Sequence, residues 1–116
     1  MGITARDGVA MYSVRQSNQE SADVQRLRQE CGAWLRSLRE RAGLSQRALA
    51  MAVGIDYYSF ISQIETGKGR IPTHQIKDWA VALKVSPRDF ARNLLRFYDP
   101  TNYDLLFGGD DAEVVE

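Results

Sequence analysis

Two short helical segments separated by a glycine, over residues 46–53 and 57–65, constrain the fold of this chain most strongly. Ser45 can cap the first segment and Asp56 the second, because both side chains accept hydrogen bonds from free amides at a helix start. Gly54 stands between the segments, where a left-handed turn favours glycine. Two short helices around such a turn are typical of a helix-turn-helix.

Three further stretches carry apolar residues at steps of three and four, the spacing that places them on one face of a helix. They predict helices over residues 21–41, 74–83 and 87–98. Gly32 interrupts the first stretch, which indicates either a close helix contact or a break between a short leader and the helix proper. No stretch alternates as a strand does, so we predict an all-α fold of five helices.

The two ends of the chain differ from this helical body in composition. Residues 1–20 are polar without sustained periodicity, so we predict a flexible N-terminal arm there. Residues 99–116 form an acidic, partly apolar C-terminal tail with six acids and no base. Residues 1–98 contain all 15 Lys and Arg and nine acids, so this part of the chain has a net charge of +6 although the net charge of the whole chain is zero. A tail that only aids solubility remains an alternative.

Cysteine and histidine usage argues against an enzyme or a metal protein. Cys31 and His74 are the only residues of their types and lie on different predicted helices, so no disulfide framework, metal site or catalytic triad is indicated. We therefore expect no cofactor and no enzymatic activity.

No apolar run approaches the ~18 residues of a membrane span, and no signal-peptide pattern opens the chain, so we expect a cytoplasmic protein.

The body also carries an ordered set of residues: Leu38-Arg39, Gly43-Leu44-Ser45-Gln46, Leu49-Ala50, Gly54-Ile55, Ile61-Ser62, Ile64-Glu65, Gly67, Pro72, Ala80, Leu83 and Val85. This order, from about Gly32 to Phe90, resembles the Cro/C1-type helix-turn-helix family, also called XRE or lambda-repressor-like. The resemblance implies a five-helix lambda-repressor-like domain over residues 21–98, with the motif over residues 45–65. It also implies a bacterial or phage transcriptional regulator that binds double-stranded DNA, usually as a homodimer on a palindromic site.

One departure from that family lies ahead of the helix expected to read DNA. The family usually places six residues between the turn glycine and the serine of the Ile-Ser pair, whereas Gly54 and Ser62 enclose seven. A helix rotates ~100° per residue, so the extra residue decides which side chains face DNA. Burial of Ile61 and Ile64 should fix the rotation, which places Tyr57 in a longer turn or at the helix start.

In that register, the front of the third helix and the start of the second face DNA. We predict base contacts for Gln46, Tyr58, Ser59 and Gln63. We predict phosphate contacts for Arg39, Ser45, Arg47, Tyr57, Lys68 and Arg70.

Two other side chains near the motif have expected structural roles. The resemblance implies a brace between Arg39 and Glu65, and an acid at a helix C-terminus is in any case unfavourable unless it is paired. Phe60 is expected to fill the core beside Trp34 or Trp79.

The predicted fifth helix carries two apolar stripes, of which only one can face its own core. We predict that a dimer or partner surface includes Leu95, Tyr98, Tyr103, Leu106 and Phe107. The alternative is that the tail folds back and covers the second stripe.

The alternative function of the protein is a protein-interaction module, for example an antitoxin or a regulator that docks a protein through its aromatic third helix or its tail.

Overall fold

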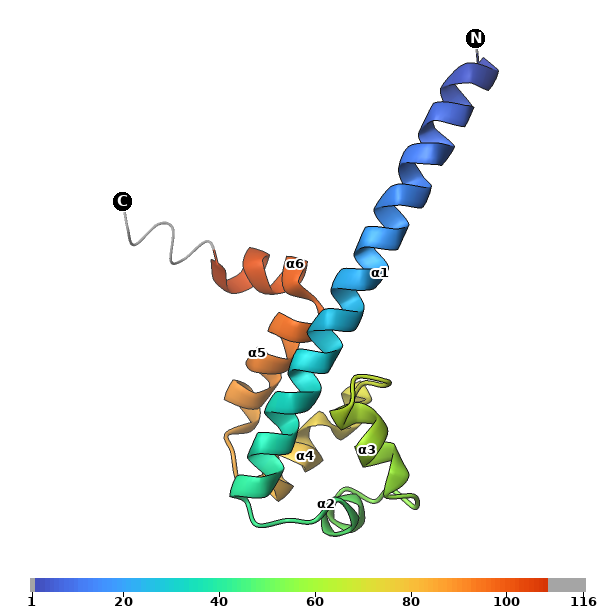
Figure 1. The fold of residues 1–116 in the computed structure, drawn as a ribbon. Helices are drawn as coiled ribbons and strands as arrows, with labels where there is room; N and C mark the ends of the chain where they lie inside the picture. The colour runs from blue at the N-terminus through green and yellow to red at the C-terminus, as the bar shows by residue number, and fades with distance from the viewer. Residues whose placement is uncertain (1, 109–116) are drawn as a thin grey trace.

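The computed structural model describes residues 2–108 and places side chains from Ser21 onward (Figure 1). The helices are α1 (Gly2–Arg41), α2 (Gln46–Ala52), α3 (Ser59–Glu65), α4 (Ile76–Ala82), α5 (Pro87–Tyr98) and α6 (Pro100–Tyr103). A 3₁₀ turn, Thr73–Gln75, leads into α4, and a π-helical turn, Asp104–Gly108, follows α6. Residues 2–108 contain no strand, so the predicted all-α fold is confirmed, with α6 as an addition to the five expected helices. Within these residues, no helix is long and apolar enough to cross a membrane.

The N-terminal part of α1 differs from the prediction. We predicted a flexible arm over residues 1–20, whereas α1 continues back to Gly2, and its first half projects beyond the body (Figure 1). Extending a helix that already exists gains one hydrogen bond per ordered residue, so it does not require an apolar stripe. Residues 2–20 contain no proline that would interrupt this extension.

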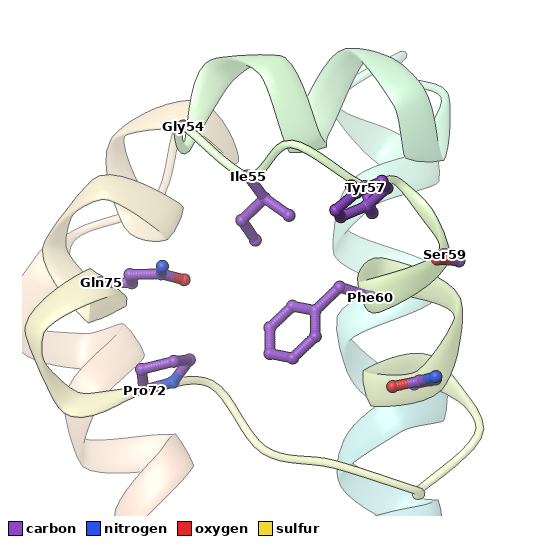
Figure 2. A pocket seen from close by; sticks show the side chains of 8 residues that line it. Gly54, Ile55, Tyr57, Ser59, Phe60, Pro72 and Gln75 are labelled. Carbon is purple, nitrogen blue, oxygen red and sulfur yellow. The ribbon is translucent and has the colours of Figure 1, made fainter.

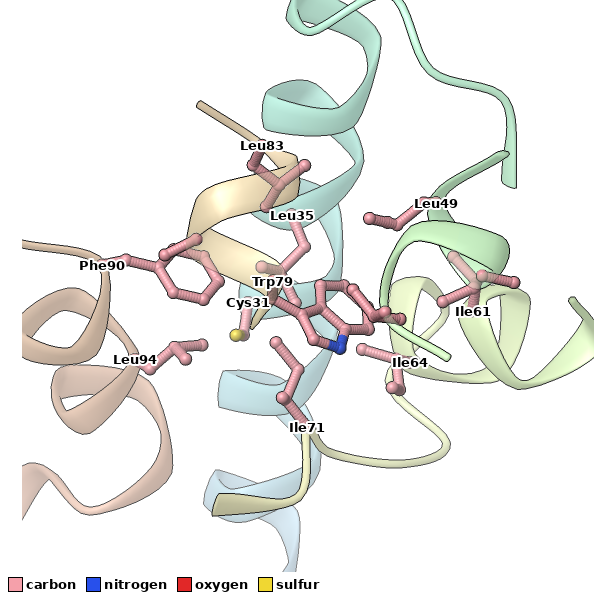
Figure 3. Packing of buried hydrophobic residues seen from close by; sticks show 13 residues of the cluster. Cys31, Leu35, Leu49, Ile61, Ile64, Ile71, Trp79, Leu83, Phe90 and Leu94 are labelled. Atoms are coloured by element: carbon pink, nitrogen blue, oxygen red, sulfur yellow. The ribbon is translucent and has the colours of Figure 1, made fainter. Parts of the chain in front are cut away.

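A single apolar cluster holds α1 to α5 together, and the indole of Trp79 lies at its centre (Figure 3). Burying one such large side chain stabilises the fold by roughly 1.5–3 kcal/mol. Each of the five helices contributes: Cys31 and Leu35 from α1, Leu49 and Ala50 from α2, Ile61 and Ile64 from α3, Trp79 and Ala80 from α4, and Phe90 and Leu94 from α5. The position of α3 is therefore set by the core of the whole domain.

The middle of α1 crosses the C-terminal end of α3 at very short range. A Cβ atom on Gly32 would lie 2.3 Å from the backbone oxygen of Glu65, so the close-contact explanation of this glycine is correct. The next contact involves Gln29, which lies one turn before Gly32 on α1. A Cβ atom on Gly67 would lie 2.9 Å from the backbone nitrogen of Gln29. Gln25 Nε2 donates a hydrogen bond to the Gly67 carbonyl, at 3.2 Å. Backbone thus packs on backbone where α3 ends.

Tyr98, the last residue of α5, serves its own domain rather than the dimer surface that we predicted for it. Its hydroxyl accepts a hydrogen bond from the Ile71 amide at 3.0 Å. Burial raises the pKa of the Tyr98 phenol above its ordinary value. The guanidinium of Arg70 lies 4.6 Å from the ring centroid. These contacts tie α5 to the loop that follows α3.

Tyr98→Phe is expected to lower the free energy of unfolding by about 1–3 kcal/mol, because the Ile71 amide would lose its partner in a partly buried place. Urea unfolding of the two proteins measures the difference. Tyr103→Phe is the matched control, since within residues 21–108 its hydroxyl has no hydrogen bond, and we expect a change below about 0.5 kcal/mol. Equal effects of the two substitutions would contradict a role for the Tyr98 hydroxyl.

The part of the tail that the structure describes folds back against α5, as the alternative prediction proposed. Asp99 caps α6 by accepting a hydrogen bond from the Asn102 amide at 3.2 Å. The guanidinium of Arg92 on α5 lies 4.4 Å from the ring centroid of Phe107, which in turn lies 5.3 Å from that of Tyr103. Tyr103 and Phe107 are therefore half-buried within one chain. Residues 109–116 of the predicted tail lie outside the described residues.

Candidate nucleic-acid interface

The start of α2 is built as the sequence predicts. Ser45 adopts an extended backbone and its Oγ accepts a hydrogen bond from the Ala48 amide at 3.0 Å, which satisfies one of the free amides of the helix start. At the other end of α2, Gly54 takes a positive φ of 75°, the left-handed conformation that glycine adopts without strain. The helix is therefore closed at both ends by the residues expected to close it.

The turn between α2 and α3 absorbs the extra residue of this chain. Because α2 ends at Ala52 and α3 begins at Ser59, the residue Tyr57 lies in the turn, in agreement with the predicted register. Our expectation that Asp56 caps the third helix is wrong. Tyr58 holds the cap position, in a helical conformation and without a side-chain cap hydrogen bond within the described residues. The longer turn displaces the aspartate from the position where its carboxylate could reach the free amides.

One face of α3 is buried and the opposite edge is exposed. Ile61 and Ile64 are fully buried, at 0% and 1% exposure, and they fix the rotation of the helix. Ser59 and Gln63, one turn apart, are both exposed on the other side. Phe60 is half-buried against the edge of the core cluster, so it is only partly the core residue that we expected.

The two tyrosines ahead of α3 present large rings to solvent. Tyr57 is 77% exposed and Tyr58 is 48% exposed, although an aromatic ring usually gains by burial. The guanidinium of Arg47, on α2, lies 4.9 Å from the ring centroid of Tyr58. This cation–π contact positions a cation and a phenol together at the front of the motif.

The Arg39–Glu65 pair implied by the family resemblance is present and buried. Arg39 Nε donates to Glu65 Oε2 at 2.6 Å and Nη2 donates to Oε1 at 3.1 Å, a bidentate arrangement. Arg39 Nη1 donates to the Leu44 carbonyl at 2.8 Å, and Gln46 Nε2 donates to Glu65 Oε1 at 3.0 Å. The hydrogen bonds with Glu65 raise the pKa of the Arg39 guanidinium. One network therefore joins the end of α1, the start of α2 and the end of α3.

This network corrects the predicted role of Arg39 as a phosphate contact. The Arg39 side chain is only 11% exposed and its three nitrogens already bond to protein acceptors, so it is not presented to a DNA backbone. Gln46 keeps its place at the start of α2, but its amide nitrogen is held by Glu65. Its orientation towards any ligand is therefore set by the brace.

The loop after α3 contains the remaining predicted phosphate contacts. Lys68 is exposed, and its amide donates to the Gln63 carbonyl at 2.8 Å, which secures the last turn of α3. Arg70 is also exposed, but its guanidinium lies over the ring of Tyr98. Lys68 therefore presents its charge beside α3, whereas part of the Arg70 side chain serves the fold.

A pocket of about 440 Å³ opens between the front of α3 and the 3₁₀ turn (Figure 2). Side chains predicted to face DNA form one wall, and Ile55, Pro72 and Gln75 form the other. Figure 2 shows the amide of Gln75 directed towards Phe60 across this space. Ile55 and Pro72 belong to the ordered set of residues in the sequence, but their place beside the DNA-facing edge was not predicted, and Gln75 was not singled out at all. Only the packing of the loop and the 3₁₀ turn beside α3 brings these three side chains there.

A capped α2, a glycine turn and an α3 held by a buried brace define a helix-turn-helix protein. Residues 25–95 match the family model described as a helix-turn-helix domain, so the chain belongs to this helix-turn-helix family. It is a DNA-binding transcriptional regulator, as its sequence indicates.

The high-resolution crystal structure of the restriction-modification controller protein C.AhdI from Aeromonas hydrophila is 35% identical in sequence to this chain. The match covers 60% of this chain and 97% of that chain, with a TM-score of 0.48. No curated protein sequence matches the chain significantly.

Proposed function

We propose that this regulator reads DNA by placing the exposed edge of α3 in a major groove, with Tyr58, Ser59 and Gln63 directed at base edges. The observation that carries the proposal is the two-sided character of α3. Its inner face is fully buried, so the domain holds the helix rigidly while these three side chains stay exposed. Gln46, oriented by Glu65, presents its amide oxygen as a further acceptor for a base amino group.

The proposed phosphate contacts surround this edge. Arg47 is exposed and lies over the ring of Tyr58, just before α3, and Lys68 is exposed just after α3, so the charges of both can neutralise phosphates beside the helix. Ser45, Tyr57 and Arg70 complete the proposed set. In this proposal Arg47 and Tyr58 act together. Their cation–π contact holds the guanidinium that binds a phosphate beside the phenol that contacts a base.

We further propose that the protein acts as a homodimer in the cytoplasm, bound to palindromic sites on the nucleoid. Leu105 and Leu106 support the dimer, since they are 77% and 61% exposed on the tail, far more than apolar side chains of this size usually are. Analytical ultracentrifugation of the full chain measures the oligomeric state. Leu106→Asp is expected to convert a dimer to a monomer without unfolding it, and a wild-type protein that is monomeric throughout would contradict this part of the proposal.

Sequencing of genomic fragments captured by the protein, followed by gel shifts on the recovered sites, tests the proposal as a whole. We expect a short palindromic consensus and an affinity that falls steeply as the salt concentration rises, because bound phosphates release counterions. Recovery of random fragments, or a complex insensitive to salt, would contradict the DNA-reading role.

Gln63→Ala is expected to relax the preference at one base pair of each half-site, at a cost of about 1–3 kcal/mol for the best sequence. Competition between the consensus and single-base variants measures this loss. Thr66→Ala is a suitable control, because this neighbouring side chain bonds back to the Ser62 and Gln63 carbonyls at the helix end. An unchanged base preference in the Gln63 variant would show that our register for α3 is wrong.

Lys68→Ala is expected to weaken binding to all sequences alike and to reduce the slope of log affinity against log salt by about 0.9, the value for one phosphate contact. Titrations at several salt concentrations measure this slope. Lys84→Ala removes an exposed cation between α4 and α5, outside the motif, and should leave the slope unchanged. If both variants behave alike, Lys68 makes no specific phosphate contact.

Docking of a protein through Tyr57 and Tyr58 is the second candidate function, and their exposure favours it. A Tyr57→Ala variant that keeps full DNA affinity but no longer binds a protein partner would support this candidate. Loss of DNA affinity in the same variant would support the DNA reading.

The proposal includes no enzymatic activity and no cofactor. Cys31 is 1% exposed and burial raises the pKa of its thiol to about 11, so it is a poor nucleophile at neutral pH. His74 lies in the 3₁₀ turn before α4, on a different element. The one cysteine and the one histidine of the chain are thus on different elements, and the thiol is poorly reactive.

A further inference from the structure

A second groove, of about 730 Å³, lies on the side of α5 that faces away from the core. The floor is apolar: Ala91 and Leu95 of α5 lie beside Ile76 of α4, and Phe107 of the tail forms one end. In Figure 1, α5 and α3 lie on opposite sides of α1, so this surface is separate from the proposed DNA-reading edge. Apolar surface of this kind on a charged helix favours an occupant with apolar side chains.

The rim of the groove is basic. Arg88 and Arg92 lie four residues apart on α5, so their guanidinium groups are neighbours on one helix face. Arg92 lies over the ring of Phe107, and within residues 21–108 neither arginine forms an ion pair. Asp89 is the one acid among the residues that line the groove, and its amide bonds to the Ser86 hydroxyl at the start of α5. Two cations against one acid favour an occupant with negative charge.

The chain itself supplies an occupant with both properties. Residues 109–116 begin two positions after Phe107, which forms one end of the groove. These eight residues contain the acids Asp110, Asp111, Glu113 and Glu116 and the apolar residues Ala112, Val114 and Val115. Fully extended, eight residues reach ~27 Å, which exceeds the ~18 Å length of a 12-residue helix such as α5.

We propose that residues 109–116 occupy the groove on α5 of their own chain, with their acids on Arg88 and Arg92 and their valines on Ala91 and Leu95. Tethering favours this occupant, because a segment joined at the groove wall is present at an effective concentration near the millimolar range. Occupation holds the acidic segment on α5, away from the basic surface around α3. It also covers the apolar stripe that would otherwise be open to a second copy of the chain.

A spin label on the tail of the full-length protein tests this proposal. Val114→Cys introduces a reactive thiol, while Cys31 stays unlabelled at neutral pH because it is buried. In the ¹⁵N-labelled protein, the amide signals of Ala91 and Leu95 should lose most of their intensity with the active label. They should recover it when the label is reduced with ascorbate.

A charge-reversed variant and a matched control separate the groove from other surfaces. Arg88→Glu with Arg92→Glu, in the labelled background, should restore the Ala91 and Leu95 signals. Arg96→Glu changes a cation of the same helix that lies 5.1 Å from the ring centroid of Phe97 and does not line the groove, so it should leave the signals broadened.

Four results would overturn the proposal. They are unbroadened α5 signals, broadening that persists in the charge-reversed variant, broadening of the Ser59 and Gln63 signals on α3 instead, and intermolecular broadening. The last is detected by mixing ¹⁵N protein without label with spin-labelled protein without ¹⁵N, and it would assign the groove to the tail of a second copy.

Discussion

Glu65→Ala is expected to reduce the free energy of unfolding by about 3–5 kcal/mol, the cost of leaving one partner of a buried ion pair without the other. Arg39 would stay charged in a place where its side chain is only 11% exposed, and Gln46 would lose the acceptor of its amide. Urea unfolding followed by circular dichroism measures the change. Because the network joins α1, α2 and α3, DNA affinity should fall together with stability.

The matched control is Glu40→Ala, which removes the acid of an exposed pair. Arg36 Nε lies 3.7 Å from Glu40 Oε2, and the two side chains are 63% and 59% exposed. The expected loss of unfolding free energy is therefore about 0–1 kcal/mol. A double replacement, Arg39→Met with Glu65→Leu, removes both charges and should recover most of the stability lost in Glu65→Ala. If Glu65→Ala costs no more than Glu40→Ala, the buried pair does not hold the motif in place.

Gly32→Ala is the second substitution with a large expected effect. The new Cβ would lie 2.3 Å from the Glu65 carbonyl oxygen and 2.7 Å from that of Ile64, both of them backbone atoms that cannot rotate aside. Overpacking of this kind costs about 1–3 kcal/mol, which should exceed the ~1 kcal/mol that alanine gains over glycine inside a helix. The relief available is a displacement of α3 from α1, so we expect weaker DNA binding as well as lower stability.

Gly69→Ala provides the same change where there is room for it. The nearest atom to a Cβ at this position is Ile64 Cγ1, at 3.8 Å, an ordinary van der Waals distance. We expect stability within about 0.5 kcal/mol of wild type and unchanged DNA affinity, measured by urea unfolding and gel shift. A Gly32→Ala protein as stable as wild type would contradict the backbone contact between α1 and α3.

The helices were largely predictable because local rules decide them. Ser45 caps α2 as expected, and the Ser86-Pro87 start places α5 at Pro87–Tyr98, the predicted range. The rotation of α3 also followed from sequence, since the burial of Ile61 and Ile64 leaves one arrangement. In contrast, the Asp56 cap failed, because a longer turn changes cap geometry without leaving a signal in hydrophobic spacing.

The side chains whose roles changed are those with partners distant in sequence. Arg39 was expected both in a brace with Glu65, 26 residues away, and at a phosphate, and the structure shows it buried in the brace. Tyr98 was expected in a dimer and instead bonds to Ile71, 27 residues away. An arginine or a tyrosine is compatible with either a surface or an interior role, so composition and spacing cannot choose between them.

By itself, the sequence determined the helix-turn-helix and the face of α3 that is buried. These follow from caps, glycine turns and apolar spacing, which act within a few residues. Only the tertiary structure decided which polar side chains remain available to a ligand. It buried Arg39, oriented Gln46, placed Gln75 beside α3 and left a basic groove on α5. The physical reason is that burial and hydrogen-bond partners depend on the packing of whole helices.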